Sequence, residues 1–184
     1  MSEKYKVIDK SIATFVTITI TDWVDLFVRR AYTDVVDESL NYCIENKGLK
    51  VHAYVYMTSH IHLVASSDGD DLQNIIRDFK KHTSKKLIET IIEIPESRRE
   101  WLLAKFKFAA NRIKRGVNYK LWKDGFHPIL LDNGEKIVQR INYIHQNPID
   151  AGFVYQEDQW KNSSFNVYAE NDGEIPNVQI SKLF

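Results

Sequence analysis

The chain has 184 residues and a mass of 21.5 kDa, which is the size of one domain. Its composition, 43% hydrophobic with seven Gly and four Pro, excludes the collagen-like, low-complexity and disordered classes. The 25 basic and 25 acidic residues give a formal net charge of zero, which for the chain as a whole argues against binding to nucleic-acid phosphates.

The first part of the chain predicts a strand, a helix and two further strands. Residues 13–20 are rich in β-branched side chains with period-two alternation, which is typical of a strand. A helix is expected from about Thr33, capped by Thr33 or Asp34, and ending at Gly48. Residues 51–57 and 61–65 predict two strands joined by a tight connection.

The second part is richer in predicted helices. Residues 70–92 predict a helix whose apolar stripe is Leu72, Ile76, Phe79, Thr83, Leu87 and Ile91. A helix over 101–113 and a bent strand over 121–131 follow. A further helix over 135–146 is expected to stop before Pro148, and Ser163-Ser164 predicts a helix cap. This order predicts an α+β domain with helices on an antiparallel sheet.

We interpret residues 1–184 as one domain, with a core over about 13–168 and a tail over 169–184. The apolar run ending at Ile20 is far shorter than the ~20 residues of a membrane span, and no signal-peptide pattern is present. The single cysteine, Cys43, cannot form an internal disulfide. These features predict a cytoplasmic, nucleoid-associated protein without a membrane partner.

The charge is unevenly distributed along the chain. Residues 77–123 hold 14 Lys and Arg against five Asp and Glu, a net charge of +9, and the rest, with 11 against 20, carries −9. In the predicted helix 70–92, Arg77, Lys81 and Lys85 share a face, with Lys80 beside it. Basic residues with interleaved aromatic ones fit a single-stranded nucleic-acid surface, although a solvated helix face gives the same pattern. If the surface binds DNA, its affinity falls as salt rises.

The sequence His60-Ile61-His62 lies at the start of a predicted strand. Residues i and i+2 of a strand project to the same face, so both imidazoles point one way and Ile61 points into the core. Two convergent imidazoles can bind a divalent cation. Two polar residues at the start of a strand are the ordinary alternative.

The last predicted helix carries two stripes of side chains. Ile137, Ile141 and Ile144 form the buried one, and about 100° round the helix lies the second, formed by Lys136, Arg140, Tyr143 and Asn147. Tyr143 and Asn147 therefore share a face with two cations. A half-buried tyrosine and an Asn-Pro helix end would also explain this pattern.

Together these motifs resemble the single-tyrosine HUH transposases, and in particular the REP-associated tyrosine transposases. The resemblance covers about residues 13–168 in five blocks, which are 55–64, 79–84, 122–128, 143–154 and 160–168. Two features depart from the family pattern. Thr58-Ser59 stands where Pro-Asn is more usual, and residues 89–117 form a longer inserted segment.

The resemblance implies a ferredoxin-like fold, the HUH endonuclease core, whose central strand carries both histidines. It also implies Tyr143 as the nucleophile and Mg²⁺ or Mn²⁺ held by His60, His62 and Asn147. The implied substrate is single-stranded or hairpin DNA, bound by a monomer or homodimer. We expect the DNA contacts to come from Arg77, Lys80, Lys81, Lys85, Lys136 and Arg140.

The implied reaction is attack of Tyr143 on a scissile phosphate, which gives a 5′-phosphotyrosine and a free 3′-OH. The covalent link conserves the energy of the phosphodiester, so a second 3′-OH can reverse the step and join strands. Two alternatives stay open. One is a non-catalytic, host-retained protein of the same fold that binds DNA hairpins. The other is a metallohydrolase in which His60, His62 and another histidine activate water.

Overall fold

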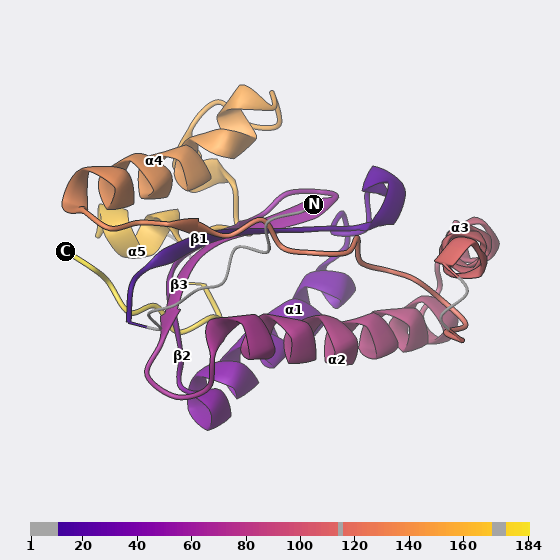
Figure 1. Ribbon diagram of the computed structural model, residues 1–184. Coiled ribbons are helices and arrows are strands. Elements are labelled where there is room, and N and C mark those ends of the chain that lie inside the picture. The colour runs from indigo at the N-terminus through magenta and orange to yellow at the C-terminus, as the bar shows by residue number, and fades with distance from the viewer. Residues whose placement is uncertain (1–10, 114–115, 171–175) are drawn as a thin grey trace.

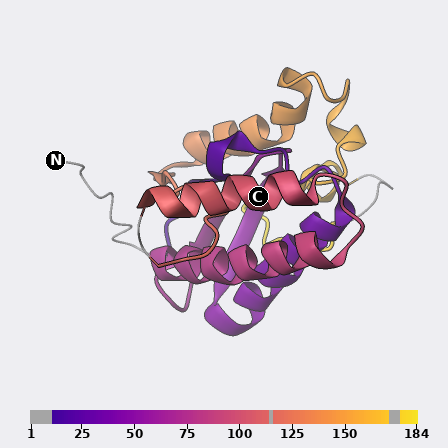
Figure 2. The same ribbon diagram turned by 90° about the vertical axis from the view of Figure 1, so that its right-hand side faces the viewer.

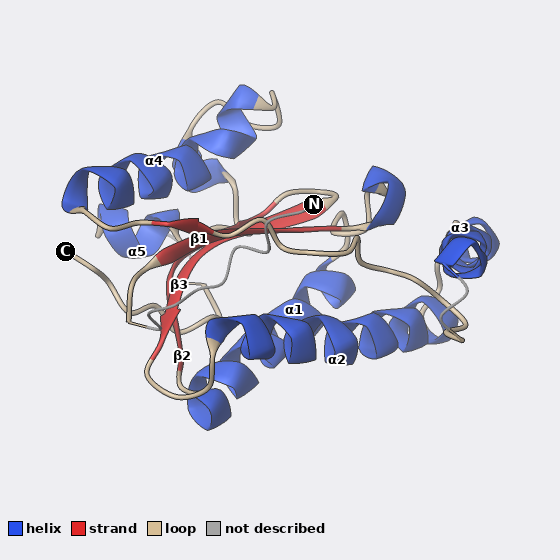
Figure 3. Cartoon of the chain, in the orientation of Figure 1, coloured by secondary structure: helices blue, strands red, loops and turns tan. Residues whose placement is uncertain are grey.

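The computed structural model describes residues 11–113, 116–170 and 176–184. In these ranges a four-stranded antiparallel sheet separates two layers of helices (Figure 1). The strands, red in Figure 3, are β1 (Thr14–Thr19), β2 (Leu49–Tyr56), β3 (His60–Ser67) and β4 (Ile129–Leu130). Their spatial order is β2-β3-β1-β4, the ferredoxin-like arrangement. This confirms the predicted fold class, with the histidines on an interior strand.

Helices α1 (Arg30–Lys47) and α2 (Leu72–Glu93) cover one face of the sheet, the lower one in Figure 1. The whole predicted apolar stripe of α2 is buried, and Asp71 caps the helix by accepting a hydrogen bond from the Gln73 N–H. The expected cap of α1 is wrong. The helix begins at Arg30, and the Thr33 hydroxyl donates to the Arg30 carbonyl instead of capping.

The other face carries α4 (Gly134–Asp150) and the short α5 (Phe165–Ala169). Ile141 and Ile144 of α4 are buried against Phe15 and Val64 of the sheet, as the stripe predicted. The expected stop before Pro148 is wrong, since α4 runs on to Asp150. Pro148 lies in the last turn, where its missing N–H costs one hydrogen bond, and its ring is buried.

Helix α3 (Arg99–Ile113) lies beyond the sheet, next to α2, and faces the viewer in Figure 2. It confirms the helix expected over 101–113. A 3₁₀ turn, η1 (Thr21–Trp23), follows β1, and a second, η2 (Glu157–Gln159), precedes α5.

The bent strand expected over 121–131 is mostly wrong, because only Ile129–Leu130 forms a described strand there. Trp122 makes a single bridge to Ile20, and the Phe126 carbonyl accepts from the Thr17 N–H. Between the bridge and β4, Gly125 and His127 adopt positive φ angles of 77° and 43°, which break the regular ladder. Among the described residues, no helix is long and apolar enough to cross a membrane.

Candidate active site between the sheet and helix α4

His60 and His62 lie on the sheet face that α4 covers. The antiparallel register places His62 opposite Thr17 and His60 opposite Thr19. The two imidazole centroids are 4.7 Å apart, so the alternation of the strand brings them together as predicted. Ile61 is fully buried in the core on the other face.

A hydroxyl group lies within hydrogen-bonding distance of one nitrogen of each imidazole. Thr17 Oγ1 lies 2.9 Å from His62 Nδ1, and Ser59 Oγ lies 3.3 Å from His60 Nδ1. When Nδ1 donates to the hydroxyl, the Nε2 lone pair is left for another ligand. In the described part of the chain neither Nε2 atom forms a hydrogen bond.

Burial keeps these imidazoles neutral. It lowers the pKa of His62 to about 3, with smaller contributions from His60 and the Arg140 guanidinium. Burial also lowers the pKa of His60. Neutral imidazole is the form that a metal ion would require, and both imidazoles are in this form at neutral pH.

Tyr143 comes to this pair from α4. Its ring contacts His62 edge-on at 5.5 Å and Phe15 at 5.9 Å, and 39% of the residue remains exposed. The Arg140 guanidinium lies 5.7 Å from the Tyr143 ring and 4.9 Å from the Phe15 ring. One chain therefore brings a phenol, two imidazoles and a cation together at one surface.

Asn147 lies one helical turn beyond Tyr143 and is half-buried. Its side chain forms no hydrogen bond with any residue the structure describes, so its amide oxygen is available to a cation. Two free Nε2 atoms and this amide are the donor types that the resemblance implies for the metal site. The described residues contain no group of three or more His, Cys, Asp or Glu that could hold a metal, so they offer no support for the three-histidine alternative.

No family model and no curated protein matches the chain. The solved structure of a REP-associated tyrosine transposase bound to a REP hairpin is similar over 100% of this chain and 94% of its own, with a TM-score of 0.67 and 18% identity. The chain has the fold of a REP-associated tyrosine transposase.

Two further solved structures are more distant. A putative transposase from Deinococcus radiodurans has a TM-score of 0.45 at 12% identity, over 78% of this chain and 95% of its own. A bacterial tRNA(His) guanylyltransferase-like protein in complex with GTP has a TM-score of 0.39 at 13% identity, over 79% and 67%. Neither adds to the argument from the transposase fold.

This transposase fold divides the predicted DNA contacts between two layers. Arg77, Lys81 and Lys85 are exposed on α2, on the opposite side of the sheet from α4. Lys80 points inward, where its ammonium donates to the Lys123 and Gly125 carbonyls and burial lowers its pKa to about 8. On α4, Arg140 contacts Tyr143, and Lys136 pairs with Asp132 at 2.8 Å.

Sequence reasoning missed three residues that build the site. Phe15 stacks on His62 at 5.2 Å, and Thr17 and Ser59 hold the imidazoles. Ser59 is next to His60 in sequence, so its position was a signal that could have been used. Phe15 and Thr17 are found only through the register between β1 and β3, which the sequence pattern leaves open.

Proposed function

We propose that the chain is a metal-dependent tyrosine transposase that nicks and rejoins single-stranded, hairpin-containing DNA. The observation that supports this most is the contact between the Tyr143 and His62 rings, which come from a helix and a strand. The fold adds support, because the similar solved transposase is bound to a hairpin.

In the proposed step the Tyr143 phenolic oxygen attacks phosphorus in line with the leaving 3′ oxygen. The P–O3′ bond breaks as the new P–O bond forms, the phenol loses its proton, and the leaving oxygen gains one to become a 3′-OH. Arg140 is placed to offset the negative charge that develops beside Tyr143. Mg²⁺ or Mn²⁺ bound by His60, His62 and Asn147 would act as a Lewis acid on the phosphate.

The polarity of this reaction gives a direct test. A pool of hairpin oligonucleotides with single-stranded flanks is incubated with the protein and Mn²⁺ and analysed on a denaturing gel. We expect a 3′ label to migrate with the protein, because the 3′ fragment carries the tyrosine-linked 5′ phosphate. A 5′ label should appear on a shorter free strand.

Tyr143→Phe should abolish the adduct, since it removes only the attacking oxygen. Tyr155→Phe is the matched control, because Tyr155 is 93% exposed and lies outside the site, and it should retain the adduct. Cleavage that survives Tyr143→Phe would favour a water nucleophile. Tight hairpin binding without cleavage by the unmodified protein would favour the non-catalytic, host-retained binding protein.

A further inference from the structure

A cavity of about 500 Å³ lies outside this site, between η1, the end of α3 and residues 120–124. Trp23 lies on one side of it, and three cations line it, Arg112, Lys120 and Lys123. Lys120 pairs with Asp124 at 2.9 Å, and Asp22 is the other acidic residue of the lining. The cavity thus combines an aromatic ring with an excess of positive charge.

Trp23 connects the cavity to the histidine pair. Its ring meets His60 edge-on at 5.4 Å, and the Lys123 ammonium lies 5.2 Å from the ring centre. The residue is nevertheless 55% exposed. A large exposed indole beside a cation is the combination that stacks a nucleic-acid base and pairs the neighbouring phosphate.

The backbone that presents this indole is strained. Asp22 and Trp23 both have φ of 56°, which lies in the left-handed region that residues with a side chain rarely adopt. The surrounding hydrogen bonds hold this conformation, since the Thr21 N–H donates to Leu121 and the Trp23 N–H donates to Ile20. Strain of this kind persists where the fold fixes a side chain in one position.

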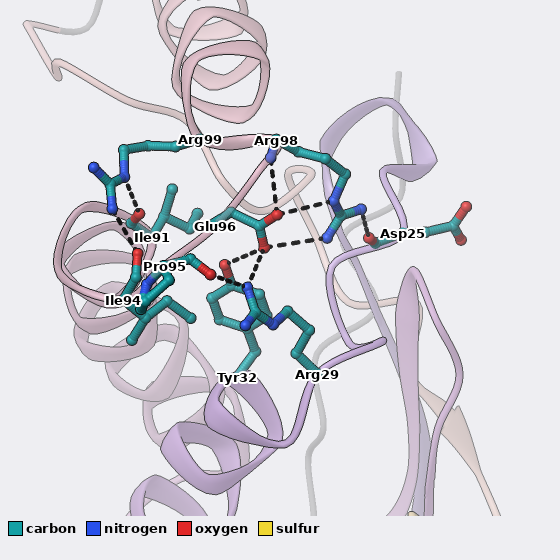
Figure 4. Close-up of polar contacts among 9 residues, drawn as sticks. All are labelled: Asp25, Arg29, Tyr32, Ile91, Ile94, Pro95, Glu96, Arg98 and Arg99. Atoms are coloured by element: carbon teal, nitrogen blue, oxygen red, sulfur yellow. Dashed lines mark hydrogen bonds and ion pairs between the residues drawn. The ribbon is translucent and has the colours of Figure 1, made fainter.

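At the other end of α3 from the cavity, a buried carboxylate organises the segment before the helix (Figure 4). Glu96, just before α3, accepts hydrogen bonds from the Tyr32 hydroxyl at 2.8 Å and from Arg98. The Arg98 guanidinium also donates to the Asp25 carbonyl at 2.8 Å, two residues after Trp23. These contacts join the start of α3 to the segment that follows η1 at a point outside the cavity lining.

We infer that this cavity is a subsite for the single strand next to the scissile phosphate, with one base stacked on Trp23 and its phosphate paired with Lys123 and Arg112. The inference rests on the proposed function only for placing the bound strand next to a scissile phosphate. Its chemistry is independent of that function, because stacking tolerates any base and needs no metal. The subsite uses α3, the inserted segment to which sequence reasoning assigned no contact.

The test is fluorescence anisotropy with labelled (dT)15 in EDTA, for the unmodified protein and for Trp23→Ala, Trp23→Phe and Trp101→Ala. Removing a stacked base platform costs about 1–3 kcal/mol, so Trp23→Ala should weaken binding roughly 5- to 150-fold. Trp23→Phe should recover most of the affinity. Trp101, 48% exposed on α3 with a Lys beside it and outside the cavity, should be replaceable without effect.

A fully abasic 15-mer gives a second measurement. Trp23→Ala should not change the affinity of the protein for this abasic strand, because no base is present to stack. Lys123→Met should lower the affinity for both the abasic strand and (dT)15. Equal affinity of the unmodified protein and Trp23→Ala for (dT)15 would overturn the subsite. If (dT)15 binding depends on Trp23 but no tyrosine adduct forms in the gel assay, the subsite stands and the proposed function fails. If the adduct forms but binding does not depend on Trp23, the proposed function stands and the subsite fails.

Discussion

At the scale of single residues, the hydroxyl of Thr17 decides how His62 can act. The 2.9 Å contact with Nδ1 orients the ring and leaves Nε2 without a hydrogen bond to any residue that the structure describes. Groups that orient a ligating histidine typically change metal affinity 10- to 100-fold when they are removed. Thr17 therefore belongs to the proposed metal site although it would not touch the ion.

Thr17→Val should lower Mn²⁺ affinity about 10- to 100-fold, measured by isothermal titration calorimetry. The valine keeps the shape of the side chain and loses only the hydroxyl. Thr19→Val is the matched control, because Thr19 lies on the same face of β1 opposite His60 and, in the structure described, forms no hydrogen bond with either imidazole. Equal Mn²⁺ affinities for the two variants would contradict this role.

His145 is buried beside the site and holds the fold rather than the substrate. Its Nε2 bonds Ser164 Oγ at 2.9 Å, and burial lowers its pKa to about 4. The unfolded chain takes up a proton near pH 6.5, whereas the folded chain does so only near pH 4. The stabilising contribution of His145 is therefore complete above pH 6.5 and is lost as the pH falls toward 4.

We expect the free energy of unfolding of the metal-free protein to fall between pH 6 and pH 5. This decrease in the free energy of unfolding should be about 1 kcal/mol smaller in His145→Gln. One extra proton bound by the unfolded chain changes that free energy by about 1.4 kcal/mol per pH unit. Urea denaturation at the two pH values measures it, with His82→Gln, at an exposed position on α2, as the control. If the free energy of unfolding has the same pH dependence in the unmodified protein and in His145→Gln, His145 is not the group that causes the loss.

At the scale of elements, one carboxylate fixes the mutual positions of α1, α2 and α3. The Glu96 side chain is 2% exposed and pairs with Arg29 of the α1 cap and with Arg98. Burial alone would raise its pKa, but hydrogen bonds from Arg98 and Tyr32 outweigh this and lower the pKa to about 2. The group is therefore charged in the folded protein at neutral pH.

Glu96→Gln should lower the free energy of unfolding by about 2 kcal/mol, since the buried side chain loses the charge that strengthens its hydrogen bonds with Arg98 and Tyr32, while both arginines stay partly exposed to solvent. Glu100→Gln on exposed α3 surface should change it by less than about 0.5 kcal/mol. Urea denaturation of the two variants at pH 7 makes the comparison. A loss no greater than that of Glu100→Gln would show that the arrangement of the helices does not depend on Glu96.

The elements that sequence patterns predicted are those whose patterns are local. The 3.6-residue stripe of α2 and the alternation around His60 depend on neighbours within one element, and both were confirmed. Pro148 and the 121–131 segment were misread because packing and positive φ angles overrode the local rule. The contact of Thr17 with His62 and the exposed position of Trp23 depend on register and strain, which no periodicity encodes.

At the scale of the whole molecule, a single chain assembles the proposed site. Tyr143 of α4 touches His62 of β3 within the same chain, so no second subunit is required to complete it. This holds whether the protein is a monomer or a homodimer. A site built within one chain and a site shared between two chains can be told apart by mixing two inactive variants.

Mixing Tyr143→Phe with His62→Ala should therefore fail to restore the DNA adduct. If tyrosine and histidines came from different subunits, a mixed dimer would contain one intact site and regain part of the activity. Titrating one variant into the other at constant total protein, with the gel assay above, measures this. An adduct that is maximal at equal amounts would show that the site is shared between chains.

The sheet separates the exposed cations of α2 from the proposed site beside α4. Arg77, Lys81 and Lys85 lie on one layer, and Tyr143 with the histidines lies on the other. Exposed side chains on α2 do not support the strands that hold the imidazoles, so they can be exchanged at little cost to stability. If the proposed function holds and α2 contacts the DNA, exchanges on this helix would change the DNA target and leave the proposed cleavage chemistry unaltered.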